Sequence, residues 1–331
     1  MPYRIAVDAM GGDHAPGAIV RGSIQALDDN AEYEIYLVGD EGRICTELDS
    51  LDFAHRERVH VVHASQTVGM GESPIEALRT KKDSSLLRMV ALAVEGQVDA
   101  MISAGNTGAC AAAAQLKLRP LPCVSRPGIA VAIPSFHRPF VLCDVGANIQ
   151  AKPQHLYQYG IMAAIFSQTV LGIERPRVAL LSVGEESRKG TDLVKQTHEL
   201  LSGDDTIDFM GNVEGRDLFH DTCDVAVCDG FVGNIVLKFV EGLAEGLFAT
   251  IAHEFEDEAP AEKEKFSAAL ERVWARHDYS EYGGAPLLGI GGVCIICHGR
   301  SKERAIRNAV RVAATFVEHD FSRLIAERLG G

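Results

Sequence analysis

The stretch Asp99–Lys117, DAMISAGNTGACAAAAQLK, contains the pattern that decides the fold. A short apolar run ends in a turn of Gly and Asn, and a helix of small residues follows. Similar apolar runs recur along the chain and are continuous rather than alternating, so both faces of each strand should be covered. Strands are expected at Arg4–Met10, Tyr33–Gly39, Arg58–His63, Asp99–Ala104, Ile129–Ile133, Phe140–Val145, Arg177–Val183 and Asp224–Asp229.

Helical patterns lie between several of these runs. This alternation predicts an α/β protein with three layers, α/β/α, around a largely parallel sheet. No shift in composition marks a boundary, so residues 1–331 are expected to form a single domain. The helices are expected at Pro16–Asp28, Ser84–Glu95, Thr107–Lys117, Pro153–Leu171 and Asp192–Leu201.

The pattern changes after Asn234. Two long helical segments, Asn234–Phe255 and Ala261–His277, predict a helical protrusion over about residues 234–280. The second segment carries an apolar stripe from Phe266 to Trp274 at helical spacing. A final helix should begin near Ser301, as its N-cap, and end near His319.

The composition excludes several classes of partner. A net charge of −14 and a pI near 5.3 argue against nucleic-acid binding, because no basic stripe offsets that field. A small anion would have to be bound locally, by backbone amides and helix N-termini. The first ten residues lack the pattern of a signal peptide, and the eight cysteines are therefore expected to be reduced thiols of a cytoplasmic protein.

Three strand ends share one design, in which Gly and Asn precede a helix. Glycine lets the backbone approach a ligand, and the helix start supplies unpaired N–H donors. One such turn alone is more simply a turn-forming sequence, but three at adjacent strand ends would form an amide-lined cradle for an anion. The candidate phosphate or substrate ligands are Ser103, Gly105, Asn106, Thr107 and Gly108 in the first turn, Asp144, Asn148 and Lys152 in the second, and Asp229 and Gly233, followed by Asn234, in the third.

Two further turns carry charged groups. Lys189 precedes a predicted helix, where it could neutralise a phosphate or an oxyanion, or simply be solvated. The surrounding sequence has the Lys–Gly order of a nucleotide P-loop inverted, which excludes that interpretation. The turn after the first strand could orient substrate or carry protons, or its Asp13 could cap the next helix; its candidates are Asp8, Gly11, Gly12, Asp13 and His14.

Other motifs are absent or misleading. Cys294–His298 matches a haem attachment pattern, but it lies in an apolar, strand-like run and is better explained as a core strand that ends in a functional or turn-forming His298–Gly299. No second cysteine pair has zinc-site spacing, and no dinucleotide fingerprint, serine elbow or zinc-protease helix is found. Neither a metal nor a cofactor is therefore expected.

The sequence resembles the phosphate acyltransferases of bacterial phospholipid synthesis. The matching blocks follow the family's order over nearly the whole chain: Ile5–Pro16, Lys81–Ser85, Ser103–Ala109, Asp144–Pro153, Gly211–Glu214, Asp229–Asn234 and Tyr279–Gly289. The resemblance implies the reaction of acyl–acyl carrier protein (acyl-ACP) with inorganic phosphate to give acyl phosphate. It also implies a homodimer, a fold similar to isocitrate and isopropylmalate dehydrogenases, and Lys189 and Asn234 as the residues essential for activity.

This chemistry needs no protein nucleophile, because phosphate is itself nucleophilic at neutral pH. The enzyme must align the phosphate with the thioester and stabilise the oxyanion. The turns Ser103–Gly108 and Asp144–Lys152 are expected to bind phosphate. Lys189 and Asn234 would polarise the thioester carbonyl or hold the phosphate, and the sequence leaves both roles open for each.

The resemblance also implies partners. The product would pass to a membrane acyltransferase that acylates glycerol 3-phosphate, with the enzyme peripheral at the inner face of the membrane. The Phe266–Trp274 stripe fits a bilayer or a dimer partner equally well, although the acidic run Glu254–Glu258 would be repelled by anionic lipid. An acidic carrier protein would need a basic patch, for which the candidate clusters are Arg79, Lys81, Lys82 and Arg88, or Arg272 and Arg276.

Three alternatives remain at this point. One is a phosphate acyltransferase that uses short acyl-CoA instead of a carrier protein. Another is a non-catalytic, membrane-docked organiser of lipid synthesis, which the polar ligand-binding turns disfavour. The third is a metal- and nicotinamide-dependent dehydrogenase on the same fold.

Overall fold

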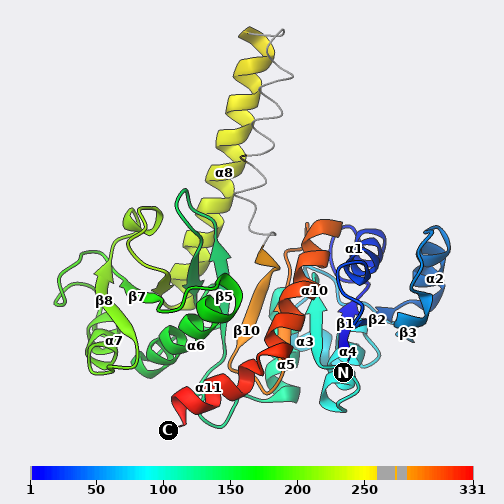
Figure 1. The fold of residues 1–331 in the computed structure, drawn as a ribbon, viewed down its shortest axis with the longest axis horizontal. Coiled ribbons are helices and arrows are strands. Elements are labelled where there is room, and N and C mark those ends of the chain that lie inside the picture. Colours follow the sequence, from blue (N-terminus) through cyan, green and yellow to red (C-terminus); the bar gives the residue numbers. More distant parts are fainter. Residues whose placement is uncertain (1, 259–272, 274–281, 331) are drawn as a thin grey trace.

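One mixed sheet of eleven strands runs through the whole molecule. The computed structural model describes residues 2–258, 273 and 282–330, and its strand order is β3-β2-β1-β4-β11-β10-β5-β6-β9-β7-β8 (Figure 1). The strands are β1 (Tyr3–Asp8), β2 (Tyr33–Gly39), β3 (Val59–His63), β4 (Ala100–Ser103), β5 (Gly128–Ile133), β6 (Phe140–Cys143), β7 (Arg177–Leu181), β8 (Asp208–Val213), β9 (Val225–Val227), β10 (Ala285–Leu288) and β11 (Val293–Ile296).

The helices connect the strands and cover both faces of the sheet. They are α1 (Gly17–Leu27), α2 (Glu41–Asp49), α3 (Pro74–Thr80), α4 (Ser85–Val94), α5 (Thr107–Leu118), α6 (Pro153–Leu171), α7 (Asp192–Ser202), α8 (Gly230–Glu258), α10 (Glu303–Glu318) and α11 (Phe321–Leu329). One apolar core unites α1, α6 and α10 with one face of the sheet, and a second unites α4 and α5 with the other. The predicted three-layer α/β/α fold is therefore confirmed.

The residues of single strands explain these two cores. Along β1, Ile5 and Val7 face one core while Ala6 faces the other, and in β4 Met101 faces away from Ile102 in the same way. Side chains alternate between the faces of a strand, so a continuously apolar strand supplies both cores at once.

The sheet consists of two parallel groups that run in opposite directions. Among the described residues, seven of the ten strand pairings are parallel, as expected for a largely parallel sheet. The three antiparallel pairings join β11 to β10, β10 to β5 and β5 to β6. The group β3-β2-β1-β4-β11 therefore runs opposite to β6-β9-β7-β8. The expectation that the three Gly/Asn turns follow adjacent strands is wrong for the turn after β4, because β11, β10 and β5 separate it from β6.

Several elements differ from the sequence prediction. β8 and β10 were not expected: β8 is an edge strand that is largely half-buried, and β10 has only four residues including Pro286. β8 carries polar residues and a glycine, and in β10 a proline, which is disfavoured inside a strand, stands at the second position. The last long helix has Lys302 rather than Ser301 as its N-cap.

Helix α8 projects far beyond the rest of the molecule (Figure 1). It begins at Gly230, four residues before the predicted start at Asn234, because Asp229 caps it. Of the Phe266–Trp274 stripe in the remainder of the predicted protrusion, Val273 is described and is exposed, and the other residues of the stripe lie outside the described residues. Within the described part of the chain, no helix combines the length and apolarity that crossing a membrane requires.

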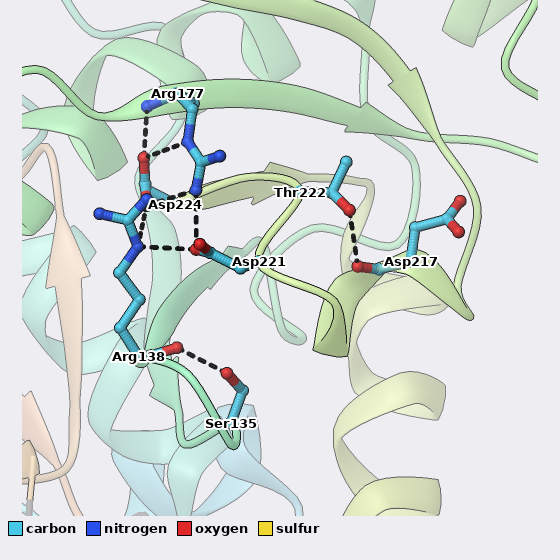
Figure 2. Close-up of polar contacts among 7 residues, drawn as sticks. All are labelled: Ser135, Arg138, Arg177, Asp217, Asp221, Thr222 and Asp224. Atoms are coloured by element: carbon cyan, nitrogen blue, oxygen red, sulfur yellow. Dashed lines mark hydrogen bonds and ion pairs between the residues drawn. The ribbon is translucent and has the colours of Figure 1, made fainter.

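A network of ion pairs holds the amino ends of the strands in the second half of the chain. The Arg177 backbone N–H and Nε donate to Asp224 Oδ2 at 2.8 and 3.0 Å, and Arg138 Nε lies 3.1 Å from Asp224 Oδ1 (Figure 2). Both guanidinium groups also contact Asp221, and the hydrogen bond from Arg138 is the main cause that lowers the pKa of that carboxyl. The network ties β7, the β5–β6 hairpin and the segment before β9 together.

The first half of the chain contains the same kind of arginine–aspartate contact. The Arg4 backbone N–H donates to Asp99 Oδ2 at 2.9 Å, and its Nη2 donates to Asp99 Oδ1 at 2.7 Å. In both halves an arginine at the start of a strand binds an aspartate that precedes the neighbouring strand. This contact fixes the register of two strands that are distant in sequence.

Replacing Arg177 by Met should destabilise the protein by about 3 kcal/mol, because Asp224, with a side chain only 1% exposed, would lose one of its two cationic partners. The matched control is Arg175→Met, two residues away, where a side chain 79% exposed pairs with Asp208 at 3.5 Å. That change should stay within about 0.5 kcal/mol. Urea unfolding of both variants measures the difference, and equal stabilities would contradict the role given to the network.

Candidate active site

A polar-rimmed cleft lies over the centre of the sheet, where the two strand groups meet. Its volume is about 110 Å³. The floor is apolar and includes Ile129, Val131 and Ile296, from β5 and β11. The rim includes Thr107 from the start of α5, Asn234, Lys238 and Glu241 from α8, and His298 from the segment after β11.

The three predicted turns each contribute one residue to this cleft. Thr107 comes from the turn after β4, Val145 from the turn after β6, and Asn234 from the turn after β9. The turns therefore meet over one face of the sheet, although β4 and β6 run in opposite directions. Gly146 also lies against Asn234, since a Cβ at Gly146 would be 3.8 Å from Asn234 Cγ.

The start of α5 is available to an anion. Asn106 caps this helix by accepting the Ala109 N–H at 3.0 Å. The first amides of the helix, at Thr107 and Gly108, have no hydrogen-bond partner among the described residues. Unpaired amides and the positive end of the helix dipole favour an anion at this point of the cleft.

The side chain of Asn106 is saturated within the protein. Its Nδ2 lies within 3.0–3.3 Å of the carbonyl oxygens of Gly69, Met70 and Glu72, to which it donates. Asn106 therefore positions the helix start and the segment 69–72 relative to each other, and its amide is not free to bind phosphate.

Asp8 and Ser103 are likewise engaged with each other. Ser103 Oγ donates to Asp8 Oδ2 at 2.9 Å, and it also accepts the Gly105 N–H at 3.1 Å. Burial raises the pKa of Asp8. A Cβ at Gly11 would lie 2.7 Å from the Gly105 nitrogen, so the turns after β1 and β4 touch backbone to backbone. These four residues join two strand ends and do not line the cleft.

The remainder of the first turn lies at the surface. Asp13 and His14 are exposed, and the Asp13 N–H donates to the Gly299 carbonyl at 2.8 Å. Gly12 has φ +100°, which favours glycine, and a Cβ there would lie 3.0 Å from the same carbonyl. The capping role considered for Asp13 is wrong, because α1 begins at Gly17 with Pro16 as its N-cap and no side-chain cap.

Asp144 organises the turn after β6. Its carboxylate is fully buried and accepts backbone N–H groups from Ile129, Gly146 and Ala147 on Oδ1, and from Asn148 on Oδ2 at 2.7 Å. Burial raises the pKa of this carboxyl, while the four N–H bonds act in the opposite direction. A carboxylate in this position would repel phosphate, so Asp144 serves to shape the turn.

Asn148 and Lys152 complete the same turn. Asn148 Nδ2 donates to the Pro127 carbonyl at 2.6 Å and lies 2.8 Å from the Tyr159 hydroxyl. The Lys152 N–H donates to His155 Nδ1 at 3.1 Å at the start of α6. Neither residue lines the cleft.

The start of α8 is packed against the Asp144 turn. Asp229 Oδ1 accepts the N–H groups of Phe231 and Val232, each at 3.0 Å, so these amides are not available to a ligand. A Cβ at Gly233 would lie only 1.9 Å from the Asp144 carbonyl oxygen. Gly230 is similarly close, with Asp144 Oδ2 at 2.8 Å from such a Cβ. Glycine at both positions allows the helix to reach the turn, which places Asn234 and Lys238 on the cleft.

Lys189 lies outside the cleft, in an exposed loop after β7. Its N–H donates to the Glu186 carbonyl at 2.9 Å, and its stem passes over Gly184. Asn212 Nδ2 donates to the same carbonyl at 3.0 Å and so holds the loop against β8. Among the described residues, no side chain forms a hydrogen bond or ion pair with the Lys189 ammonium group.

Two cleft residues were not predicted as ligands. Lys238 Nζ lies 3.3 Å from His298 Nε2 and 2.7 Å from Glu241 Oε2. Burial, followed by the charge of Lys238, lowers the pKa of His298, which keeps its ring neutral near pH 7. His298 Nδ1 lies 3.2 Å from the Arg300 backbone nitrogen, and Nε2 faces the Lys238 ammonium group. The Lys238 ammonium and the His298 ring therefore meet on one side of the cleft, and an anion bound there would compete with Glu241 for the ammonium group.

Sequence signals for this pair were weak. His298 follows an apolar strand, and Lys238 stands in a helix without a motif, 60 residues away. The position of Lys238, one helical turn after Asn234, was the available clue, since residues four apart share a helix face.

Comparison with known proteins gives consistent matches. The fatty acid synthesis protein family matches residues 3–324. The chain is 47% identical to a phosphate acyltransferase of Heliobacterium modesticaldum, covering 99% of this chain and 98% of that protein. It is 44% identical to a phosphate acyltransferase of Halothermothrix orenii, covering 98% of each.

Solved structures share the fold at low sequence identity. A phosphotransacetylase from Streptococcus pyogenes superposes with a TM-score of 0.67 at 16% identity, over 96% of this chain and 94% of that one. A 4-hydroxythreonine-4-phosphate dehydrogenase from Klebsiella pneumoniae gives a TM-score of 0.50 at 13% identity, over 96% of this chain and 98% of that one. At these identities the likeness concerns the fold alone.

Replacing Gly233 by Ala should destabilise the protein by about 3 kcal/mol and lower activity, because the new Cβ would overlap the Asp144 carbonyl and push α8 away from the cleft. The matched control is Gly242→Ala in the same helix, where nothing lies within 4 Å of the added Cβ. That variant should be about 0.5–1 kcal/mol more stable than the wild type, since alanine favours a helix. Thermal unfolding reports both, and a Gly233→Ala variant as stable as Gly242→Ala would refute the close approach.

Proposed function

The chain belongs to the phosphate acyltransferase family, and on that premise we propose that it transfers a fatty acyl group from acyl carrier protein to inorganic phosphate. Full-length similarity to relatives named phosphate acyltransferase supports transfer of an acyl group to phosphate. The carrier-protein donor and the role in phospholipid synthesis are the finer part of the proposal, and they rest on the family resemblance of the sequence.

The observation that carries the proposal is the set of donors on the cleft. Lys238 Nζ and His298 Nε2 are 3.3 Å apart, and the unpaired amides at the start of α5 are on the same cleft. Together they would hold a phosphate dianion despite the chain's net charge of −14. Asn234 adds an exposed amide that can donate to a developing oxyanion.

The proposed reaction balances in atoms and charge with phosphate and the thioester as its two reactants. An oxygen of HPO₄²⁻ attacks the thioester carbonyl carbon, and a tetrahedral oxyanion forms. The C–S bond then breaks, the acyl phosphate is released, and the phosphate's proton passes to the departing thiolate. Neutral His298, through Nε2, can assist this proton transfer. Lys189 and Asn234 are proposed to stabilise the oxyanion or position the phosphate.

The predicted basic cluster for docking the carrier is largely engaged internally. Lys81 pairs with Glu72, Arg88 Nε lies 2.6 Å from Asp83, and Lys82 Nζ donates to the Leu78 carbonyl at 2.9 Å. These contacts reduce the positive field that an acidic partner would meet. The alternative cluster, Arg272 and Arg276, lies outside the described residues.

Purified protein should form acyl phosphate and free thiol in equal amounts when it is given long-chain acyl carrier protein and phosphate. Replacing Lys189 or Asn234 by Ala should lower kcat by about 10²–10³-fold, the usual effect of losing one oxyanion donor. Replacing Lys238 by Met should mainly raise KM for phosphate, since its ammonium is proposed to bind the ground-state dianion. Thiol release and product identification by mass spectrometry measure these effects.

The control in this assay is Lys195→Met, which removes an ammonium of α7 that pairs with exposed Asp192 and does not line the cleft. Its activity should match the wild type. Activity with short acyl-CoA but not with the carrier protein would favour the alternative donor. Absence of acyl phosphate from every donor would overturn the proposed function.

We also propose a homodimer that associates with the inner face of the membrane and supplies a glycerol-3-phosphate acyltransferase there. An exposed apolar stripe on α8 supports an interface. Its members repeat every four residues, and each is more than half exposed: Phe231, Ile235, Phe239, Leu243 and Leu247. Monomeric proteins rarely expose such a continuous patch.

Replacing Leu243 by Asp should convert a dimer into a monomer, because it places a charge in the stripe. The control is Leu116→Asp, at an exposed leucine of α5 outside the stripe. Sedimentation velocity measures the assembly state, and flotation with phospholipid vesicles measures membrane association. Loss of flotation with the dimer intact would assign the stripe to the membrane instead.

A further inference from the structure

A second cavity lies on the other side of the first turn of α8. It has a volume of about 310 Å³ and opens at the carboxyl ends of β7 and β9. Its walls come from α6, α7 and α8 through Leu156, Val194 and Val232 respectively. It shares no lining residue with the cleft.

The walls of this cavity are mainly apolar. Leu156 and Cys228 are buried, and Leu181 forms part of the same surface. At the edge, Val183 is 81% exposed, which is unusual for a valine beside a pocket wall. An apolar ligand would cover this side chain and would gain free energy with each methylene removed from water.

The polar groups of the cavity do not suit an anion. The Asp229 carboxylate caps α8 and would repel a phosphate. Cys228 Sγ is directed to the Asp144 carbonyl oxygen at 3.6 Å, and burial raises the pKa of this thiol well above its usual value. Ser182 Oγ is buried without a hydrogen-bond partner among the described residues. The cavity therefore differs in chemistry from the donor-rich cleft.

Both residues proposed to act on the thioester are close in sequence to wall residues of this cavity, although neither of them lines it. Gly190 in its wall directly follows Lys189, and the loop is closed at its base, since a Cβ at Gly190 would lie 2.9 Å from Ser182 Oγ. Val232 in the opposite wall precedes Asn234 by two residues on α8. An acyl chain would therefore enter this cavity near Lys189 and the start of α8.

We propose that this cavity binds the acyl chain of the donor and sets the chain length that the enzyme prefers. The inference rests on the proposed function. The acyl carbonyl lies at the rim near Lys189 and Asn234, the chain extends past Val194 and Val232, and phosphate approaches from the cleft. The cavity's volume of about 310 Å³ leaves room for a run of methylene groups of the acyl chain.

The test enlarges and reduces one wall residue and compares donors of different length. Val194→Phe fills part of the cavity, and Val194→Ala widens it. The measured quantity is the ratio of kcat/KM for a sixteen-carbon donor to that for a four-carbon donor, with phosphate saturating. The Phe variant should lower this ratio by about fourfold for each methylene it excludes, and the Ala variant should raise it.

The matched control is Leu200→Phe, a substitution on the same helix at a residue that does not line the cavity. It should leave the ratio at the wild-type value. Circular dichroism verifies folding, and if Val194→Phe fails to fold, a raised ratio in Val194→Ala supports the inference and an unchanged or lowered ratio overturns it. An active wild type whose ratio is unchanged in the folded Val194 variants would overturn this inference alone. A wild type that forms no acyl phosphate from any donor would overturn the proposed function.

Discussion

The close approach of α8 to the Asp144 turn is the contact on which the candidate site depends. The buried Asp144 carboxylate gathers four backbone N–H groups and so fixes a turn that could not otherwise bury its amides. Gly230 and Gly233 then let the helix backbone lie directly on that turn. The rigid helix carries Asn234 and Lys238 to the cleft on one side and Val232 to the apolar cavity on the other.

The direction of the strands explains why the site lies over the sheet and not along one edge. The two parallel groups run in opposite directions, so their carboxyl ends point to opposite edges. β10 and β5 join the groups, and the cleft forms over this junction, where α5 and α8 reach the same face. Arginine–aspartate contacts at the amino ends of the strands stabilise both groups, and Figure 2 shows those of the second half of the chain.

The position of α8 separates an anion site from an apolar cavity, and the proposed reaction needs both. Phosphate needs donors and a cation, whereas a fatty acyl chain needs apolar walls, and one pocket could not supply both without burying unpaired polar groups. The first turn of α8 divides the two environments. The donors on the cleft also explain how a strongly acidic chain can bind an anion, because amides and single cations act at short range while the net charge is screened by salt.

The sequence by itself determined most of the alternating strands and helices, the Gly/Asn turns and a long helix after Asn234, because each depends on local backbone preferences and periodicity. The family resemblance, and with it the choice of Lys189 and Asn234, also came from the sequence. Only the tertiary structure decided what the side chains in the turns do. Asn106, Asp144 and Asn148 are of ligand-binding type, yet distant backbone groups occupy them. Lys238 and His298 belong to no motif, yet the packing of α8 brings them together. A hydrogen bond depends on atoms that meet in space, and the reversal of strand direction at β10, set by contacts between remote segments, determines which atoms meet.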